Sequence, residues 1–327
     1  MNFSQKIYKP IKKVVFLGKS KKKTGNSRFM FKALCQRVPT TSFINIPRFK
    51  NLYFWTDYTK KISQKIEKIS PDLILIYSKD IPLQVLQELH QTYSTAIFYP
   101  DLRHPLDTKL ITYGQLVDCL FLTNKTQLKH YMAQGVPHAV FCLQACDKNE
   151  HRIVKAQSHK WCSDVAFIGR PGQGYRVDLL QKINHFFDLK LWGSSEWQKW
   201  GLLCRKNHIY VKEYAKICSG AKIILGCDQF YDMECYFSNR TWITLGCGGF
   251  LLTNYTPGLE TIFTKGRHLE WYHSQEECFD LISYYLNHDQ KRQKIAIKGY
   301  EYVHEYHTYD AMIDEIVSYM ESGLYAL

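Results

Sequence analysis

Short apolar runs alternate with amphipathic stretches along the whole chain, and this alternation constrains the fold more than any other feature. In the first half the apolar runs are Val14–Gly18, Ser42–Ile46, Leu73–Tyr77, Ala96–Tyr99, Cys119–Thr123 and Ala139–Leu143. The stretches with helical periodicity are Ser27–Arg37, Thr56–Lys68, Pro82–Thr92 and Lys125–Gln134. Strands that are apolar throughout, separated by helices, are typical of a parallel sheet covered on both faces. The pattern therefore predicts an α/β domain.

The second half repeats the pattern. Its predicted strands are Val165–Gly169, Leu189–Gly193, Lys222–Gly226, Phe250–Thr253 and His268–Trp271. Its predicted helices are Val177–Phe187, Val211–Cys218, Ser238–Leu245, Ser274–Leu286 and Gln290–Tyr306. Because 327 residues exceed the usual ~100–200 of one domain, we expect two such domains facing each other across a cleft.

The polar stretch Asp147–Ser163 has no clear period and is predicted to be the linker between the domains. The expected division is an acceptor-side domain over 1–150 and a second domain over 151–309. A last helix, near Asp310–Glu321, is expected to pack back across the junction as a separate segment, 310–327.

The charge of the chain is unevenly distributed. The chain has 43 basic and 30 acidic side chains and a formal net charge of +13. Residues 1–150 hold 23 basic and 10 acidic side chains, whereas residues 151–327 hold 20 of each. An apolar fraction of 45% excludes a disordered chain, so the basic excess belongs to a folded surface. It predicts an anionic partner for the first half.

No run of 18 or more apolar residues occurs, and the basic N-terminal segment lacks the apolar core of a signal peptide. We therefore expect a cytoplasmic protein, with peripheral association at the inner membrane face as an alternative. The 11 cysteines form no C-x-x-C pair and show no metal-ligand spacing with histidine. Free thiols, no bound metal and no cofactor are expected.

One segment carries a resemblance to a known family. Ser238–Phe263, SNRTWITLGCGGFLLTNYTPGLETIF, resembles the core of the group 1 glycosyltransferases, and above all their CgeB-like branch. Asp164–Arg170, Leu191–Gly193 and Tyr210–Tyr214 agree with that family in order and spacing. The resemblance extends over roughly Asp164–Asp310. It implies the GT-B fold, with two Rossmann-like domains, and a retaining, metal-independent transfer from a nucleoside-diphosphate sugar bound as substrate by the C-terminal domain.

Arg176 and Arg240 are the predicted catalytic cations. Arg170 and Arg176 bracket a glycine-bearing loop between a strand and a helix, where guanidinium groups and a helix N-terminus can bind a diphosphate. The alternative is a solvated loop. Asn239 and Arg240 follow Ser238, a good N-cap, and resemble donor-contacting positions of the family. We expect Arg176 and Arg240 to act in catalysis and Arg170 and Asn239 to bind the donor.

Further donor-binding residues are expected on the same domain. Gly248 and Gly249 lie at a helix C-terminus, where a turn with positive φ and close packing is an equally good interpretation. Gly258, Leu259 and Glu260 follow a strand, and Glu260 resembles a family residue that contacts the sugar as a buried carboxylate; its alternative is a helix-start Glu stabilised by the dipole. Tyr210 and Val211 are expected to contact the base through backbone atoms.

The chain departs from the broader family at one point. That family carries two glutamates eight positions apart, and the corresponding residues here are Cys235 and Ile243. The second glutamate typically grips the ribose, and isoleucine accepts no hydrogen bond. Losing such a bond to a charged group costs roughly 1.5–3 kcal/mol. The departure leaves open an unusual donor or a chain that has lost catalysis.

The first half holds two candidate loops. The loop after the first strand contains Lys19, Lys21, Lys22 and Lys23, which we expect to meet an anionic acceptor; a solvated loop is the alternative. Asp101, Arg103 and His104 follow the fourth strand. Asp101 and His104 are predicted to act on a hydroxyl of donor or acceptor, with Arg103 on the acceptor side; a plain stiff turn is the alternative.

The sequence thus predicts a glycosyltransferase that uses a nucleotide-sugar and an anionic or surface-bound acceptor, such as one on an anionic membrane surface. One alternative is a DNA-modifying glycosyltransferase or nucleic-acid binder, given the sequence pI of about 9.1. Another is a non-catalytic protein that binds sugar nucleotides. The donor base, the sugar, the acceptor and the oligomeric state are left open.

Overall fold

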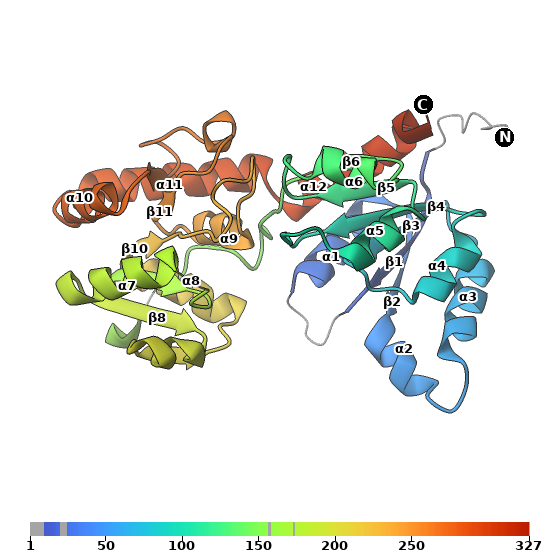
Figure 1. The fold of residues 1–327 in the computed structure, drawn as a ribbon, viewed down its shortest axis with the longest axis horizontal. Coiled ribbons are helices and arrows are strands. Elements are labelled where there is room, and N and C mark those ends of the chain that lie inside the picture. The colour runs from blue at the N-terminus through green and yellow to red at the C-terminus, as the bar shows by residue number, and fades with distance from the viewer. Residues whose placement is uncertain (1–9, 20–24, 156–157, 173, 327) are drawn as a thin grey trace. The chain divides into compact units, whose positions relative to one another are not determined.

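The computed structural model describes residues 10–19, 25–155, 158–172 and 174–326. The chain divides into two compact units (Figure 1). Unit 1 comprises Met1–Leu143 and Tyr309–Leu327, and unit 2 comprises Gln144–Thr308. The predicted linker, Asp147–Ser163, therefore falls inside unit 2, where His151 and Trp161 are buried. Most of its residues are polar and few of its side chains are buried, so its sequence resembles that of a linker.

Unit 1 is a six-stranded parallel sheet with strand order β2-β1-β3-β4-β5-β6. Its strands are β1 (Lys13–Gly18), β2 (Thr40–Asn45), β3 (Leu73–Tyr77), β4 (Ser94–Tyr99), β5 (Cys119–Leu122) and β6 (Ala139–Phe141). Its helices are α1 (Asn26–Arg37), α2 (Ile46–Leu52), α3 (Tyr58–Ile69), α4 (Leu83–Leu89), α5 (Thr108–Gly114), α6 (Leu128–Ala133), α12 (Tyr309–Ser322) and the 3-10 turn η4 (Leu324–Ala326).

Helices cover both faces of this sheet, as its apolar strands require. Val15 and Leu17 of β1 pack with Ile62 and Ile66 of α3. Phe16, between them, points to the other face and stacks on Phe31 of α1 with ring centroids 6.3 Å apart. Alternate residues of one strand therefore belong to two different layers.

The C-terminal helix α12 packs against α1 and brings acidic side chains to a basic region. Arg37 of α1 forms ion pairs with Asp314 and Glu321, both at 2.7 Å. Residues 309–327 contribute four acidic side chains and no basic one, so unit 1 has a formal net charge of +10 and unit 2 of +3. The charge asymmetry is smaller between the folded units than between the two halves of the sequence.

Unit 2 is a second six-stranded parallel sheet, with strand order β12-β11-β10-β7-β8-β9. Its strands are β7 (Ser163–Ile168), β8 (Leu189–Gly193), β9 (Cys204–Asn207), β10 (Ala221–Leu225), β11 (Leu251–Asn254) and β12 (Glu270–Tyr272). Its helices are α7 (Tyr175–Phe186), α8 (Val211–Gly220), α9 (Asn239–Gly246), α10 (Gln275–Leu286), α11 (Asp289–Tyr306) and the 3-10 turns η1 (His159–Trp161), η2 (Ser195–Trp200) and η3 (Leu259–Thr261).

Both sheets reverse their strand order once. In unit 1 the chain passes from β2 across β1 to β3, and in unit 2 it passes from β9 across the sheet to β10, beside β7. In open parallel sheets, ligands bind outside the carboxyl ends of the strands at such a switch point. A ligand site is therefore expected at the loops after β1 and β3 in unit 1, or after β7 and β10 in unit 2.

All eleven cysteines are free thiols, and eight of them are buried. None of the helices in the described ranges is long and apolar enough to cross a membrane. In the same ranges, no group of three or more His, Cys, Asp or Glu side chains could hold a metal ion.

Candidate functional site

Arg176 joins the two loops at the switch point of unit 2. Its Nε donates to the carbonyl oxygen of Cys227, after β10, at 2.8 Å, and its Nη1 donates to that of Arg170, after β7, at 3.2 Å. Only 8% of the residue is exposed. Burial, followed by the positive charge of Arg240, lowers the pKa of Arg176. The predicted catalytic cation thus also holds the loops together.

Arg240, the second residue of α9, reaches the same place. Its Nη1 donates to the carbonyl oxygen of Ile168 at 3.2 Å, and its guanidinium lies 5.1 Å from the ring centroid of Phe167. The guanidinium of Arg176 lies 5.7 Å from the centroid of the same ring. Two cations therefore share one aromatic ring at the end of β7.

One buried carboxylate opposes this pair of cations. Asp228 lies 3.2 Å from Nη2 of Arg240 and accepts the backbone N–H of Ser238 at 3.2 Å. Its own N–H donates to the side-chain oxygen of Asn254 at 2.6 Å, which fixes the loop. Two guanidinium groups and one carboxylate leave a surplus positive charge in a partly desolvated place, which favours an anion. Sequence reasoning missed Asp228, although it follows a predicted strand by two residues.

The cap of α9 and the glycine beside Arg240 both differ from what the sequence predicts. Ser238 is the N-cap residue of α9 but makes no side-chain cap bond; its Oγ accepts from Nε of Arg240 at 3.2 Å instead. Gly169 leaves space for Arg240, because a Cβ there would overlap with Nη1 of that arginine. The glycine that matters for Arg240 therefore precedes Arg170, which is itself exposed.

The corresponding place in unit 1 is charge-paired. Lys19, after β1, contacts Asp80, after β3, with its Nζ at 2.7 Å and its N–H at 2.9 Å. Lys79 forms an ion pair with Asp107, which also accepts the hydroxyl of Tyr99 at 3.0 Å. Lys19 is therefore paired with a carboxylate, whereas the sequence suggested that it was available to an anionic acceptor. Lys21, Lys22 and Lys23 lie outside the described residues.

Asp101, Arg103 and His104 are exposed at the carboxyl end of β4, where the sequence placed them. Their segment is anchored by its backbone, because Nε2 of Gln127 donates to the carbonyl oxygen of Arg103 at 2.7 Å. The chain therefore holds the segment while its ionisable side chains face outward.

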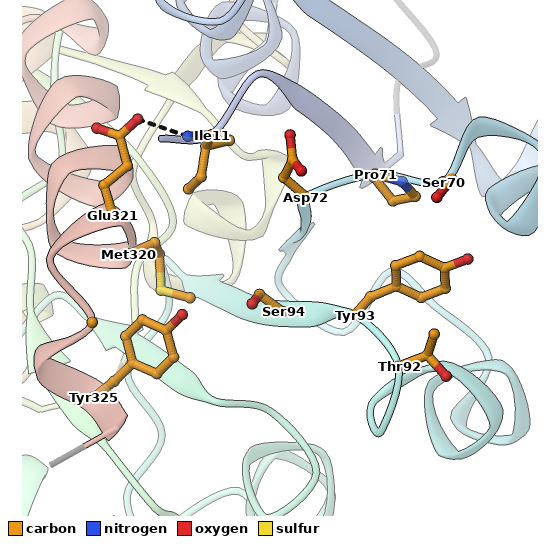
Figure 2. A pocket seen from close by; sticks show the side chains of 11 residues that line it. Ile11, Ser70, Pro71, Asp72, Thr92, Tyr93, Ser94, Met320, Glu321 and Tyr325 are labelled. Atoms are coloured by element: carbon orange, nitrogen blue, oxygen red, sulfur yellow. Dashed lines mark hydrogen bonds between the residues drawn. The ribbon is translucent and has the colours of Figure 1, made fainter. Parts of the chain in front are cut away.

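A separate cavity of about 480 Å³ lies at the opposite, amino edge of the unit 1 sheet (Figure 2). Its two carboxylates already bind the protein itself. Glu321 accepts the N–H of Ile11 at 2.9 Å, and Asp72 accepts the N–H groups of Lys12 and Lys13 at 3.0 and 2.9 Å. Size alone does not make this cavity the functional site, since it is far from the carboxyl edge of its sheet.

The comparisons with known proteins agree with the geometry. Residues 176–318 match a family model described as glycosyl transferase-like. Spore protein CgeB of Bacillus subtilis (strain 168) is 24% identical over 286 residues, covering 76% of this chain and 82% of that protein. The chain is therefore similar in sequence to the glycosyl transferase-like family over residues 176–318 and to CgeB over most of its length.

The likeness to solved structures shows that the chain has the GT-B fold. Anabaena Alr3699/HepE, in complex with UDP and glucose, superposes with a TM-score of 0.66 at 11% identity, covering 95% of this chain and 99% of that chain. An alpha-glucosyltransferase in complex with UDP-glucose and DNA containing an abasic site superposes with a TM-score of 0.65 at 11% identity, with the same two coverages.

Two glycines that the sequence placed among the donor-binding residues lie at the other edge of the unit 2 sheet. Gly248 and Gly249 follow α9 and precede β11, so they are at the amino edge of the sheet, opposite Arg240. A Cβ on Gly248 (φ 71°) would overlap with Ile153. Gly249 is packed among Thr244 and Ile224. The alternative interpretation, a turn with close packing, describes these glycines, because α9 carries the chain from one edge of the sheet to the other.

The segment after β11 also differs from the prediction. Glu260 is exposed rather than buried and accepts the hydroxyl of Tyr255 at 3.0 Å. Leu259 is 1% exposed, and its N–H donates to Thr256 at 3.0 Å, so neither group is available to a ligand. Gly258 (φ 89°) has no space for a side chain, because a Cβ would meet Sγ of Cys235 at 2.5 Å.

The remaining positions have local explanations. Tyr210 is the 47% exposed N-cap residue of α8, beside Val211, and its N–H donates to Glu213 at 3.2 Å. Asn239 is the first residue of α9. Ile243 packs against the core cluster that contains Tyr214 and Ile217. The family's ribose-gripping carboxylate is thus replaced by an apolar side chain that faces the core.

Proposed function

We propose that this protein transfers a hexose from uridine diphosphate sugar and binds the diphosphate between Arg176 and Arg240. The observation that carries the proposal is a pair of guanidinium groups, one buried and one partly buried, opposed by one carboxylate at the switch point of unit 2. The HepE structure with UDP and glucose supports this choice of donor class.

The chemistry follows from where negative charge develops. Cleavage of the bond between the anomeric carbon and the diphosphate oxygen leaves that charge on the diphosphate. Arg176 and Arg240 are fixed by carbonyl oxygens before the reaction, so they stabilise the charge with little reorganisation. The N-termini of α7 and α9 add positive potential in the same region.

We further propose retention of anomeric configuration and no need for a metal, as the resemblance implies. The anomer released is identified by proton NMR of the product. Retention of activity in a chelator supports the metal-independent reaction, and restoration by a divalent cation contradicts it.

The acceptor is proposed to be anionic or held at an anionic surface, and to contact unit 1. The net charge of +10 on that unit supports this, as do Asp101, Arg103 and His104 exposed after β4. Because Lys19 is paired with Asp80, the test is to replace Lys21, Lys22 and Lys23 together by Gln. Acceptor use should weaken while UDP affinity stays unchanged.

A second candidate is glycosyl transfer to DNA. It is favoured by the basic excess of unit 1 and by the likeness to the DNA-bound alpha-glucosyltransferase. A steep fall of acceptor affinity with salt is expected for any polyanion, so duplex DNA must be compared directly with anionic vesicles. A third candidate, a non-catalytic sugar-nucleotide binder, is motivated by Ile243. Detection of donor hydrolysis or transfer eliminates it.

The deciding experiment is a thermal-shift panel with UDP, UDP-glucose and other nucleotide-sugars, followed by calorimetric titration. A ligand that binds only the folded chain raises its melting temperature by mass action. Arg240→Met should abolish the shift caused by UDP, whereas Arg267→Met, which removes an exposed arginine of the same unit, should retain it. Binding of UDP by both variants with equal affinity would contradict the proposal.

A further inference from the structure

The connection between α2 and α3 exposes a cluster of large apolar side chains. Trp55 is 83% exposed, Leu52 65% and Phe54 63%. The rings of Phe54 and Trp55 have centroids 4.1 Å apart. We call these three residues the apolar tip. Figure 1 shows this connection at the periphery of unit 1, beyond the sheet. Three such side chains side by side on a surface mark an interaction site.

The backbone of this connection is ordered by local hydrogen bonds. The N–H of Tyr53 donates to Phe49 at 3.0 Å, and that of Thr56 donates to Tyr53 at 3.0 Å. Asp57 is the N-cap of α3 and accepts the N–H of Thr59 at 3.0 Å. The tip is therefore built on a defined turn between two capped helices, and its apolar side chains are exposed in the folded chain.

Basic side chains lie on the two helices that flank the apolar tip. Six of them are exposed on α2 and α3: Arg48, Lys50, Lys60, Lys61, Lys65 and Lys68. The same stretch has only two acidic side chains, Asp57 and Glu67, and Asp57 is engaged as a cap. In the part of the chain that the structure describes, none of the six forms an ion pair with a carboxylate. We call these six residues the basic collar.

We propose that the apolar tip inserts into the interface of an anionic lipid bilayer while the basic collar binds the lipid phosphates. Trp and Phe favour the boundary between headgroups and acyl chains, and lysines near it are attracted by the negative surface potential. The combination is complementary in both polarity and charge to such a surface. The inference concerns binding alone, so it can fail or succeed independently of sugar transfer.

A single-stranded nucleic acid fits the tip less well. Such ligands stack their bases on aromatic faces along a groove. Here Leu52 offers no aromatic face, the rings of Phe54 and Trp55 are in contact with each other, and the side chains stand on a turn at the edge of the unit. The lipid surface uses all three side chains, whereas a nucleic acid would use only the rings.

The test is sedimentation of the full chain with vesicles of phosphatidylglycerol and phosphatidylcholine in equal parts, against vesicles of phosphatidylcholine alone. Binding is expected only to the anionic vesicles. Trp55→Ser and Phe54→Ser should each weaken it by about tenfold or more. The double variant Lys60→Gln/Lys61→Gln should weaken it by about tenfold and reduce its salt dependence.

Matched controls show whether vesicle binding depends on the apolar tip and the basic collar or on any exposed tryptophan or lysine. Trp200→Ser removes an exposed tryptophan of unit 2, and Lys109→Gln/Lys129→Gln removes two exposed lysines of unit 1 outside the collar. Both should bind vesicles like the parent chain. All variants should keep its melting temperature and UDP affinity, so that a failure here is distinct from a failure of the proposed function.

Three results would overturn the inference. One is equal binding of the parent chain and Trp55→Ser to the anionic vesicles. Another is binding of a labelled oligothymidine that Trp55→Ser abolishes, without vesicle binding, which would identify a nucleic-acid surface. The third is a dimer in analytical ultracentrifugation that Trp55→Ser converts to monomer, which would identify a second copy of the chain as the occupant.

Discussion

The two units have similar sheets and switch points but opposite arrangements of charge there. In unit 2, Arg240 forms an ion pair with Asp228, and the buried Arg176 beside it donates to backbone carbonyl oxygens. In unit 1, Lys19 and Lys79 each have their own carboxylate, Asp80 and Asp107. Yet unit 1 carries the larger net charge. The proposed diphosphate site therefore lies where cations outnumber carboxylates locally, in the unit that has the smaller net charge.

The strongest test of this contrast replaces Arg176 by Met. Turnover should fall by about 10²–10³-fold, the effect of removing one donor that stabilises transition-state charge. The unfolding free energy should fall by about 1–3 kcal/mol, because two carbonyl oxygens lose their donor. Steady-state kinetics and urea unfolding measure the two effects.

Arg292→Met is the matched control for this experiment. Arg292 is 6% exposed in the same unit and donates to a backbone carbonyl, that of Tyr285, away from the switch point. It should lose stability but keep the turnover of its folded fraction. Equal losses of turnover in both variants would mean that Arg176 acts only through the fold.

A second test compares the glycines after the first strand of each unit. Gly169→Ala should displace the guanidinium of Arg240, because the new methyl group overlaps with Nη1. Misplacing a reacting or binding group by about 1 Å costs up to about 100-fold in rate. Gly25→Ala in unit 1 places its methyl group in open space and should change nothing. Comparable losses in both would show that the arginine's position is not what matters.

The sequence predicted the interior of both sheets well. Leu73–Tyr77 and Leu189–Gly193 were located to the residue; the first is a continuous apolar run, and the second is an apolar segment interrupted by the partly exposed Lys190. β9 (Cys204–Asn207) was missed, since three of its four residues are exposed and the strand lies at the sheet edge. The short helices α2 and α5 were missed as well; α2 buries none of its residues and α5 only Leu110 and Gly114, so neither shows a clear apolar face.

The candidate site was predicted in part. Arg176 was selected because it follows a glycine-bearing loop between a strand and a helix, and Arg240 because it resembles a donor-contacting position of the family; the structure brings both to one place. Asp228 was missed because its role depends on Arg240, twelve residues later, and only folding brings the two together. The exposure of Glu260 and the amino-edge position of Gly248 depend on how segments pack, which no local pattern encodes.

Acid should destabilise unit 2 more than unit 1, because unit 2 contains a buried histidine. His151 of unit 2 is fully buried, and burial, aided by the charge of His304, lowers its pKa to about 4. Between pH 6.5 and 4 the unfolded chain binds a proton that the folded chain does not, so stability falls as pH falls. From pH 7 to pH 5 the unfolding free energy should drop by roughly 2 kcal/mol from this group.

Urea unfolding of His151→Asn at the two pH values measures this contribution. The variant has no titrating group at that position, so its loss between pH 7 and pH 5 should be smaller than that of the parent chain. None of the described histidines of unit 1 is buried, and His90→Asn should reproduce the parent's loss. An unchanged pH dependence in His151→Asn would show that the acid sensitivity has another source.

The smallest expected effect comes from unpairing Lys19. Asp80→Asn keeps an oxygen that can accept the N–H of Lys19 but removes the opposing charge. Since the Lys19 side chain is 64% exposed, solvent screens the pair, and stability should fall by about 1 kcal/mol or less. The control Asp72→Asn alters another carboxylate that accepts backbone N–H groups, at the other edge of the same sheet. If pairing is what distinguishes the switch points, Asp80→Asn alone should create weak, salt-sensitive binding of inorganic diphosphate in addition to that of unit 2.

A double variant, Arg240→Met with Asp80→Asn, isolates that new site, because the proposed binding pair of unit 2 is then broken. Failure of this double variant to bind diphosphate would show that the lower exposure of the two arginines, and not the count of carboxylates, sets the difference between the units.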